Sequence, residues 1–349
     1  METAVLLSGG VDSSLALHLL REAGHRLRAF YLKVWLEEEL SFLGDCPWEE
    51  DLRYAQAVCA QAGVPLEIVP LQAEYLEKVV EHALDELRAG RTPSPDIHCN
   101  RRIKFGAFLD RLGGVFAKVA SGHYARLEEQ HGQYRLLRAA DPVKDQTYFL
   151  SDLDQGQLGQ VLFPIGHLPK QEVRRLAAQY GLPTQDRKDS QGICFLGRID
   201  YRAFVRARLG ERPGAIVDRQ SGKTLGTHRG LWFHTIGQRH GLGLGGGPWF
   251  VVGKDLEAEV LWVAHEAQEE VRLRHRFEVG RPHWISAPPG EGEVAVKLRH
   301  GPQTTRCTLS PLEAGRLLVE LSQPDPGVAP GQHAVFYQDE VCLGGAVIT

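Results

Sequence analysis

The sequence lacks the features that would place it in a membrane or outside the cell. No apolar run is long enough to span a bilayer, and the first residues show no basic segment followed by an apolar run and a cleavage site. We therefore expect a cytoplasmic protein with no membrane partner. The six cysteines include no Cys-x-x-Cys pair, which in a reducing compartment favours separate thiols over a disulfide framework.

The chain also has little net charge. Its 349 residues carry a formal charge of −4 at pH 7, with 43% hydrophobic and 24% charged residues, as in an ordinary globular protein. This balance gives no support to nucleic-acid binding, but it hides a basic block. Residues 198–254 contain ten Lys or Arg residues against three acids, whereas residues 37–51 contain seven acids and no Lys or Arg. The block predicts a contact with a phosphate backbone, with a solvated face as the alternative.

Two common phosphate-binding signatures are missing near the N-terminus. The glycines there are not followed by the Lys-Ser/Thr of a Walker loop, and they lack the GxGxxG spacing of a dinucleotide fold. Residues 4–20 instead contain an apolar run, a Ser-Gly-Gly turn and apolar positions at helical spacing. A buried strand that ends in paired glycines beside a helix start presents backbone N–H groups at the positive end of a helix dipole. This stretch predicts a phosphate cradle, with a plain serine-capped turn as the alternative.

The residues of this cradle have different tasks. Two glycines allow a close backbone approach, and three serines add hydroxyl donors and helix-capping groups: Gly9 and Gly10, then Ser8, Ser13 and Ser14. Asp12 is unusual in this position, because a carboxylate beside a phosphate is repulsive unless it holds a magnesium ion.

The first two thirds of the chain alternate strand and helix patterns. Strands are expected at residues 27–33, 66–69 and 117–121, and helices at 49–62, 74–89, 103–112, 170–180 and 201–209. This alternation predicts a parallel α/β sheet whose ligands lie beyond the carboxyl ends of the strands, where the Ser8 loop and Gly122 would meet. Beyond residue 210, short β-rich runs between glycines and prolines predict small antiparallel β modules. These runs are residues 215–218, 224–227, 249–252, 260–263, 294–298, 317–321, 334–337 and 341–348.

Four of the cysteines give no sign of chemistry. Cys59, Cys307 and Cys342 lie in apolar helical or strand-like runs and are expected to be buried small hydrophobes. Cys46 lies in the acidic segment, where neighbouring carboxylates disfavour its thiolate.

The other two cysteines are candidates for reactivity. Cys99 follows a turn-rich segment near a helix start and precedes Arg101 and Lys104, and both features lower a thiol pKa. Cys194 lies in a glycine-flanked loop with basic neighbours. Both are expected in polar loops that meet over the nucleotide, so that one of them carries a sulfur nucleophile. Two unrelated thiols are the alternative.

Eight segments carry a resemblance to a known family. They are SGGVDSS (8–14), CPWEEDL (46–52), AGRTPSPDIHCNRRIKF (89–105), SGHYAR (121–126), KDQTYFL (144–150), DSQGICFLG (189–197), HTIGQRHGLGLG (234–245) and VKLRHG (296–301). The first resembles the pyrophosphate loop of the ATP pyrophosphatases, and the whole set, in order, resembles the tRNA-specific 2-thiouridylases. The resemblance implies an α/β fold with an adenine-nucleotide-hydrolase-like N-terminal domain at residues 1–200. It also implies a small β-rich, tRNA-binding or adaptor domain at 201–270 and a C-terminal β-barrel at 271–349.

The implied reaction is the ATP-dependent 2-thiolation of the wobble uridine, position 34, in tRNAs for Lys, Glu and Gln. ATP adenylates the C2 oxygen, a persulfide on Cys194 attacks, and Cys99 completes the transfer or closes a disulfide. The sulfur would come from a cysteine desulfurase or a sulfur-relay protein. The implied catalytic residues are Cys99, Cys194 and Asp12, with Mg²⁺ on Asp12.

The resemblance also implies binding residues. Those for ATP are Leu6, Leu7, Ser8, Gly9, Gly10, Val11, Asp12, Ser13, Leu32 and Gly122. Those for tRNA are Ser94, Pro95, Asp96, Lys144, Asp145, Gln146, Arg299 and His300. The family usually has Met, Asn and Tyr where this chain has Leu32, Ser94 and His300.

Three alternatives stay open. An iron–sulfur cluster on Asp96, Cys99 and Cys194 would turn the cysteines into cluster ligands. The second alternative is an ATP pyrophosphatase that uses an amine nucleophile. The third is a tRNA-binding paralogue that has lost thiolation.

Overall fold

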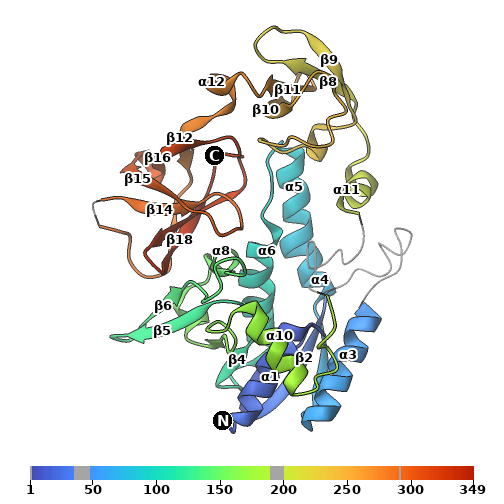
Figure 1. The fold of residues 1–349 in the computed structure, drawn as a ribbon, viewed down its shortest axis with the longest axis vertical. Coiled ribbons are helices and arrows are strands. Elements are labelled where there is room, and N and C mark those ends of the chain that lie inside the picture. The colour runs from blue at the N-terminus through green and yellow to red at the C-terminus, as the bar shows by residue number, and fades with distance from the viewer. Residues whose placement is uncertain (1, 35–47, 189–199, 291) are drawn as a thin grey trace.

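The computed structural model describes residues 2–34, 48–188, 200–290 and 292–349. It has the expected α/β class, with a parallel-sheet part followed by two β-rich parts (Figure 1). Helix α5 (His82–Arg88) runs from the parallel-sheet part toward the central β part, and the C-terminal sheet lies to one side of it. Among the described residues, no helix has the length and apolar character needed to cross a bilayer.

The N-terminal sheet has the strand order β3-β2-β1-β4-β7, and all of its pairings are parallel. Its strands are β1 (Glu2–Leu6), β2 (Arg26–Lys33), β3 (Leu66–Pro70), β4 (Lys118–Ala120) and β7 (Val161–Leu162). Its principal helices are α1 (Val11–Glu22), α3 (Trp48–Ala62) and α10 (Lys170–Gln179). Because β1 lies in the middle, its residues Ala4 and Val5 are fully buried, as an apolar strand requires. The strands expected at residues 27–33, 66–69 and 117–121 and the helices expected at 49–62 and 170–180 are confirmed.

Two broken helices pack over this sheet and form the largest apolar core. The first combines α4 (Gln72–Tyr75), the π-helical turn η2 (Leu76–Glu81) and α5; the second combines α6 (Pro95–His98), the π-helical segment η3 (Cys99–Ala107) and α7 (Phe108–Leu112). The sequence predicted helix only over residues 103–112 and left Cys99 in a loop. That prediction was wrong, because the helix already begins at Pro95, where a proline is favoured at the first turn.

The central part is a small sheet with the order β10-β11-β8-β9. Its elements are α11 (Tyr201–Leu209), β8 (Gly214–Asp218), β9 (Thr224–His228), η4 (Leu231–Phe233), β10 (Trp249–Asp255) and β11 (Val260–His265). Ile216, Val251, Leu261 and Val263 form its core. The four predicted β runs of this part are confirmed, but β11 pairs with β8 in parallel, so the sheet is mixed and the expected antiparallel arrangement is wrong for this pair.

The C-terminal sheet contains strands from two distant parts of the chain. Its order is β12-β16-β15-β14-β17-β18-β6-β5, with β13 on β18. The late elements are α12 (Glu269–Arg272), β12 (Arg274–Val279), β13 (His283–Trp284), β14 (Val294–Lys297), β15 (Thr305–Pro311), η5 (Glu313–Gly315), β16 (Leu317–Asp325), β17 (His333–Gln338) and β18 (Val341–Val347). The hairpin β5 (Arg126–Gln130) and β6 (Gln133–Leu137) extends the sheet through β6 and β18.

This hairpin was not expected, because the sequence assigned residues 1–200 to the α/β domain alone. Strand pairing places residues 126–137 on the C-terminal sheet, while the proposed boundaries at residues 200 and 270 stay predictions. The short helices α8 (Thr147–Leu150) and α9 (Gln155–Leu158) follow the hairpin. They hydrogen-bond the C-terminal part through Tyr337 and Ile285, and η3 through Asn100 and Arg101.

Candidate functional site

The predicted cradle is the turn between β1 and α1. Gly9 has φ +74°, and a Cβ atom there would lie 2.3 Å from the backbone oxygen of Asp51, so only glycine fits. The Ser13 hydroxyl accepts from the Ser8 amide at 3.2 Å and donates to the Gly10 carbonyl at 3.1 Å. No side chain caps the first turn of α1 at Gly10. The serines therefore shape the loop, and the helix start can receive an anion.

Gly122 meets this loop from β4. A Cβ atom at Gly122 would lie 2.6 Å from the Ser13 amide nitrogen and 2.8 Å from the Asp12 carbonyl carbon. Leu32 lies near the end of the neighbouring strand β2, paired with Val69. The carboxyl ends of three adjacent strands thus bring the predicted ATP residues to one edge of the sheet, as a parallel α/β sheet requires.

Asp12 has two partners that the sequence did not reveal. The Lys170 ammonium group donates to both carboxylate oxygens, at 2.7 and 2.9 Å, and the Tyr124 hydroxyl donates to Oδ1 at 2.7 Å. Lys170 is the first residue of α10 and its side chain is only 13% exposed. The positive charge that we expected from magnesium is therefore supplied by Lys170. The carboxylate accepts three hydrogen bonds in this structure, and the predicted Mg²⁺ on Asp12 stays a prediction.

Arg187 brings a second positive charge to the loop. It donates to the Gly9 carbonyl at 2.7 Å and to Asp51 Oδ1 at 2.6 Å, and its guanidinium lies 4.4 Å from the ring centre of Tyr54. Arg187 is one of the basic neighbours of Cys194 in the sequence, and no contact with the Gly9 loop was expected of it. Because Gly9 lies in the loop and Asp51 in α3, the Arg187 side chain links the loop to α3.

A neutral histidine borders the same edge of the sheet. His123 Nδ1 lies 2.8 Å from the Ser121 hydroxyl, and its ring packs near Phe105 and Phe163. Burial lowers the pKa of His123 well below 6.5, and the charge of Lys104 adds to the effect. His123 is therefore neutral at pH 7.

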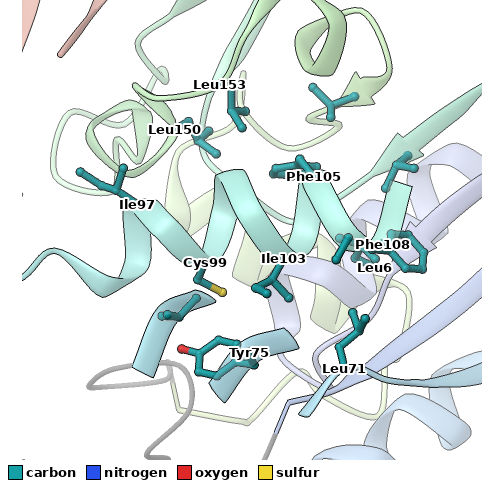
Figure 2. Close-up of a cluster of buried hydrophobic side chains, with 14 of the residues drawn as sticks. Leu6, Leu71, Tyr75, Ile97, Cys99, Ile103, Phe105, Phe108, Leu150 and Leu153 are labelled. Atoms are coloured by element: carbon teal, nitrogen blue, oxygen red, sulfur yellow. The ribbon is translucent and has the colours of Figure 1, made fainter. Parts of the chain in front are cut away.

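Cys99 is buried in a helix and does not lie in a polar loop. It is 2% exposed and packs in the apolar cluster, on the face of its helix toward Tyr75 (Figure 2). Cys194 and Cys46 lie outside the described residues, so the predicted meeting of Cys99 with Cys194 stays a prediction. The same holds for an iron–sulfur cluster on Asp96, Cys99 and Cys194. Within the described ranges, no group of three His, Cys, Asp or Glu side chains is arranged to hold a metal ion.

The three cysteines predicted to be structural are buried, as expected. Cys59, Cys307 and Cys342 are 4%, 1% and 1% exposed. Burial raises the pKa of Cys59 to about 11 and the pKa values of Cys307 and Cys342 to about 12. They are therefore protonated and unreactive at pH 7.

The three segments predicted to bind tRNA come together at the junction of α6, α8 and the C-terminal sheet. Ser94 precedes Pro95 at the start of α6 and hydrogen-bonds Tyr148. His300 stacks on Phe149 with ring centres 4.7 Å apart, and its Nε2 lies 3.2 Å from the Asp145 carbonyl oxygen. Burial lowers the pKa of His300, although the carboxylates of Asp145 and Asp96 oppose this.

Not all predicted tRNA residues are available to a ligand. Asp145 is 1% exposed and pairs with Lys297, so its side chain is not open to a ligand here, and its contact with tRNA stays a prediction. Gln146 exchanges two hydrogen bonds with the backbone of Tyr124, both 2.9 Å long. Lys144 is part-exposed, and Arg299 is more than half exposed while it holds Asp325.

Comparisons with known proteins cover the whole chain. Residues 1–198 match the family described as tRNA methyl transferase HUP domain, 202–265 the tRNA methyl transferase PRC-barrel domain, and 260–348 the Aminomethyltransferase beta-barrel domain. A tRNA-specific 2-thiouridylase MnmA 1 from Bacteroides thetaiotaomicron is 46% identical over 356 residues, covering 100% of both chains. A tRNA-specific 2-thiouridylase MnmA from Porphyromonas gingivalis is 43% identical over 360 residues, covering 100% of this chain and 99% of that one.

Among solved structures, one similar chain is a U34-tRNA thiolase from Methanococcus maripaludis with its [4Fe-4S] cluster. It shares 16% identity over 59% of this chain and 64% of that chain, with a TM-score of 0.34. A likeness of this size is too weak to carry a functional conclusion.

Proposed function

The chain belongs to the family of tRNA-specific 2-thiouridylases, enzymes that thiolate tRNA uridine, and we propose that its substrate is the wobble uridine at position 34 of the tRNAs for Lys, Glu and Gln. The family sets the reaction class, a tRNA sulfurtransferase on an ATP-binding fold. The tRNA set, the cytoplasmic location and the use of a desulfurase or relay protein as sulfur donor belong to the proposal.

The observation that carries the proposal is the convergence of Gly9 and Gly122 on the start of α1. Both positions exclude a Cβ atom, so the strand ends pack closely around a helix start that has no side-chain cap and can receive a triphosphate. Leu6, Leu7 and Val11 hold the turn from the core side, and Leu32 and Gly122 border the space assigned to adenine. Lys170 and Arg187 reduce the negative charge of Asp12 and Asp51, which would otherwise repel phosphate.

The proposed chemistry has three steps. The uridine C2 oxygen attacks the α-phosphorus of ATP and pyrophosphate leaves. The terminal sulfur of a Cys194 persulfide attacks C2, and the oxygen departs with AMP. Cys99 then attacks the inner sulfur, which forms a Cys99–Cys194 disulfide and releases 2-thiouridine; a thiol reductant restores both cysteines.

For tRNA, the proposal keeps Ser94–Asp96 and Arg299–His300 as contacts, together with Lys144. The side chains of Asp145 and Gln146 bind other protein groups and hold this surface in place without facing the tRNA. Arg299 holds Asp325 in a two-pronged pair, and that geometry also suits a phosphate.

The test is incubation of the full chain with ATP, magnesium, unmodified tRNA, a thiol reductant and a cysteine desulfurase with cysteine as the persulfide source, followed by mass spectrometry of the nucleosides. We expect 2-thiouridine at position 34 together with one pyrophosphate per thiolation. Pyrophosphate release that needs ammonia instead of the persulfide donor would replace the proposal with an amine-transferring enzyme. Binding of tRNA without any ATP turnover would replace it with a non-thiolating paralogue.

A further inference from the structure

Lys297 and Asp145 form an ion pair that is fully withdrawn from water. Lys297 lies on β14 of the C-terminal sheet, and its Nζ atom is 2.7 Å from Asp145 Oδ2, with both side chains 0% exposed. The ammonium group also lies 5.1 Å from the ring centre of Tyr337. A buried ion pair is a weak source of stability, since desolvation offsets its attraction. Its presence therefore calls for a role other than stability.

The pair organises residues 138–146, which we name the linking loop. Asp145 Oδ1 accepts from the Thr147 hydroxyl at 2.8 Å and from the amides of Ala139 and Thr147 at 3.3 Å. Arg138 Nε lies 3.3 Å from Oδ2. Asp145 thus closes the linking loop on itself and ties it to the C-terminal sheet through Lys297.

The linking loop holds both partners of Asp12. Gln146 bonds the amide and the carbonyl of Tyr124, whose hydroxyl donates to Asp12. Asp141 Oδ2 accepts from the Lys170 amide at 3.0 Å, at the start of α10. Two separate routes therefore run from this loop to the carboxylate in the nucleotide cradle.

We propose that Lys297 is a positioning residue for the nucleotide site, acting through Asp145 and the linking loop on Tyr124 and Lys170. The C-terminal sheet then helps to position the ATP site, in addition to the proposed tRNA contacts of Arg299 and His300. The inference rests on the proposed binding of ATP at the Gly9 loop.

The experiment compares three variants of the full chain. Lys297→Met removes the charge and keeps the apolar stem. Lys297→Met with Asp145→Asn removes both charges and keeps the acceptor for Thr147, so that no unpaired buried charge remains. Lys118→Met is the matched control, because the Lys118 ammonium group also lies over a tyrosine ring, 5.4 Å from the ring centre of Tyr134. It donates to the Gly159 carbonyl from the first residue of β4, away from the linking loop.

The readouts are the Kd for a non-hydrolysable ATP analogue, the KM for ATP in tRNA-dependent pyrophosphate release, and the melting temperature. Lys297→Met is expected to lower the melting temperature and to raise Kd and KM for ATP about five-fold or more, a common size for coupling between sites. The double variant is expected to regain stability but keep the raised Kd. The control is expected to lose stability with an unchanged Kd.

A double variant with the wild-type Kd overturns the inference, because the pair would then be structural only. If Lys297→Met does not fold, the double variant decides alone. A wild-type chain that binds the analogue but never thiolates tRNA contradicts the proposed function and not this inference, since the Kd is measured without turnover.

Discussion

The ammonium group of Lys170 donates to both carboxylate oxygens of Asp12, at 2.7 and 2.9 Å, although the two residues are 158 positions apart. The contact joins the start of α10 to the first turn of α1, next to the phosphate cradle. It pairs the carboxylate of the loop with a positive charge and makes α10 part of the proposed nucleotide site.

Replacing Lys170 with Met should weaken ATP binding. The bare Asp12 carboxylate would then face the phosphates, and we expect KM for ATP to rise about tenfold, equal to about 1.4 kcal/mol. Pyrophosphate release with tRNA measures the effect. Arg175→Met, on the exposed face of the same helix, is the control and should leave KM unchanged. Adding Asp12→Asn to Lys170→Met should restore part of the affinity, and equal KM values for Lys170→Met and wild type would contradict the assignment.

Gly9→Ala should impair the cradle more than a positive φ alone explains. Alanine at such a φ costs about 1 kcal/mol, and at Gly9 its Cβ would also overlap the Asp51 carbonyl oxygen. Gly24→Ala is matched, because Gly24 has φ +82° and no atom within 4 Å of the added Cβ. We expect Gly24→Ala to lower stability slightly and Gly9→Ala to abolish ATP binding as well, measured by calorimetry. Equal affinity in the two variants would show that the loop does not bind ATP.

Cys99→Ser and Cys194→Ser should each abolish thiolation while tRNA binding persists, because both sulfurs enter the proposed transfer. Cys59→Ser is the control for loss of a buried thiol, since Cys59 lies in α3, in a different core cluster. Thiolation is measured by nucleoside mass spectrometry and binding by filter retention. An active Cys99→Ser variant would remove Cys99 from the mechanism.

Acid should destabilise the contact between α6 and the C-terminal sheet. His98 is 8% exposed, with its ring 4.4 Å from His82 and 5.8 Å from His333. Burial, with the charges of His82, Arg102 and His333, lowers the pKa of His98 to about 3, while Asp152 opposes this. The unfolded chain therefore binds a proton that the folded chain excludes, and stability falls as the pH drops from about 6.5 toward 3.

The slope for one such proton is about 1.4 kcal/mol per pH unit. His98→Phe removes one titrating group and should reduce the slope by up to this amount, measured by urea unfolding between pH 4.5 and 7. Ile97→Val, on the same helix, should lower stability by about 1 kcal/mol at every pH without changing the slope. An unchanged slope in His98→Phe would assign the acid sensitivity to other groups.

Local patterns predicted most of the elements around the site. Apolar alternation and glycine stops placed β2, α3 and α10 correctly, because each of these elements is specified by its own residues. Cys99 was misplaced for the opposite reason: turn-forming residues before it suggested a loop, whereas packing against Tyr75 extends the helix.

The lysine partners of the two carboxylates could not be predicted from the neighbouring sequence. Nothing near Asp145 in the sequence announces Lys297, 152 residues later, and nothing near Asp12 announces Lys170. The hairpin at residues 126–137 was also missed, although its alternating side chains and the His-Gly turn were a usable signal. The sequence therefore predicted the motifs, and the fold showed which of their side chains are buried in protein contacts and which are exposed.

The pairing of β6 with β18 has a consequence for biosynthesis. The hairpin leaves the ribosome about two hundred residues before its partner strand is made. During that interval the open backbone edge of β6 can pair with other chains, so nascent polypeptides of this length are expected to need a chaperone. The N-terminal half of the enzyme therefore reaches its final fold only after the last strand has been translated.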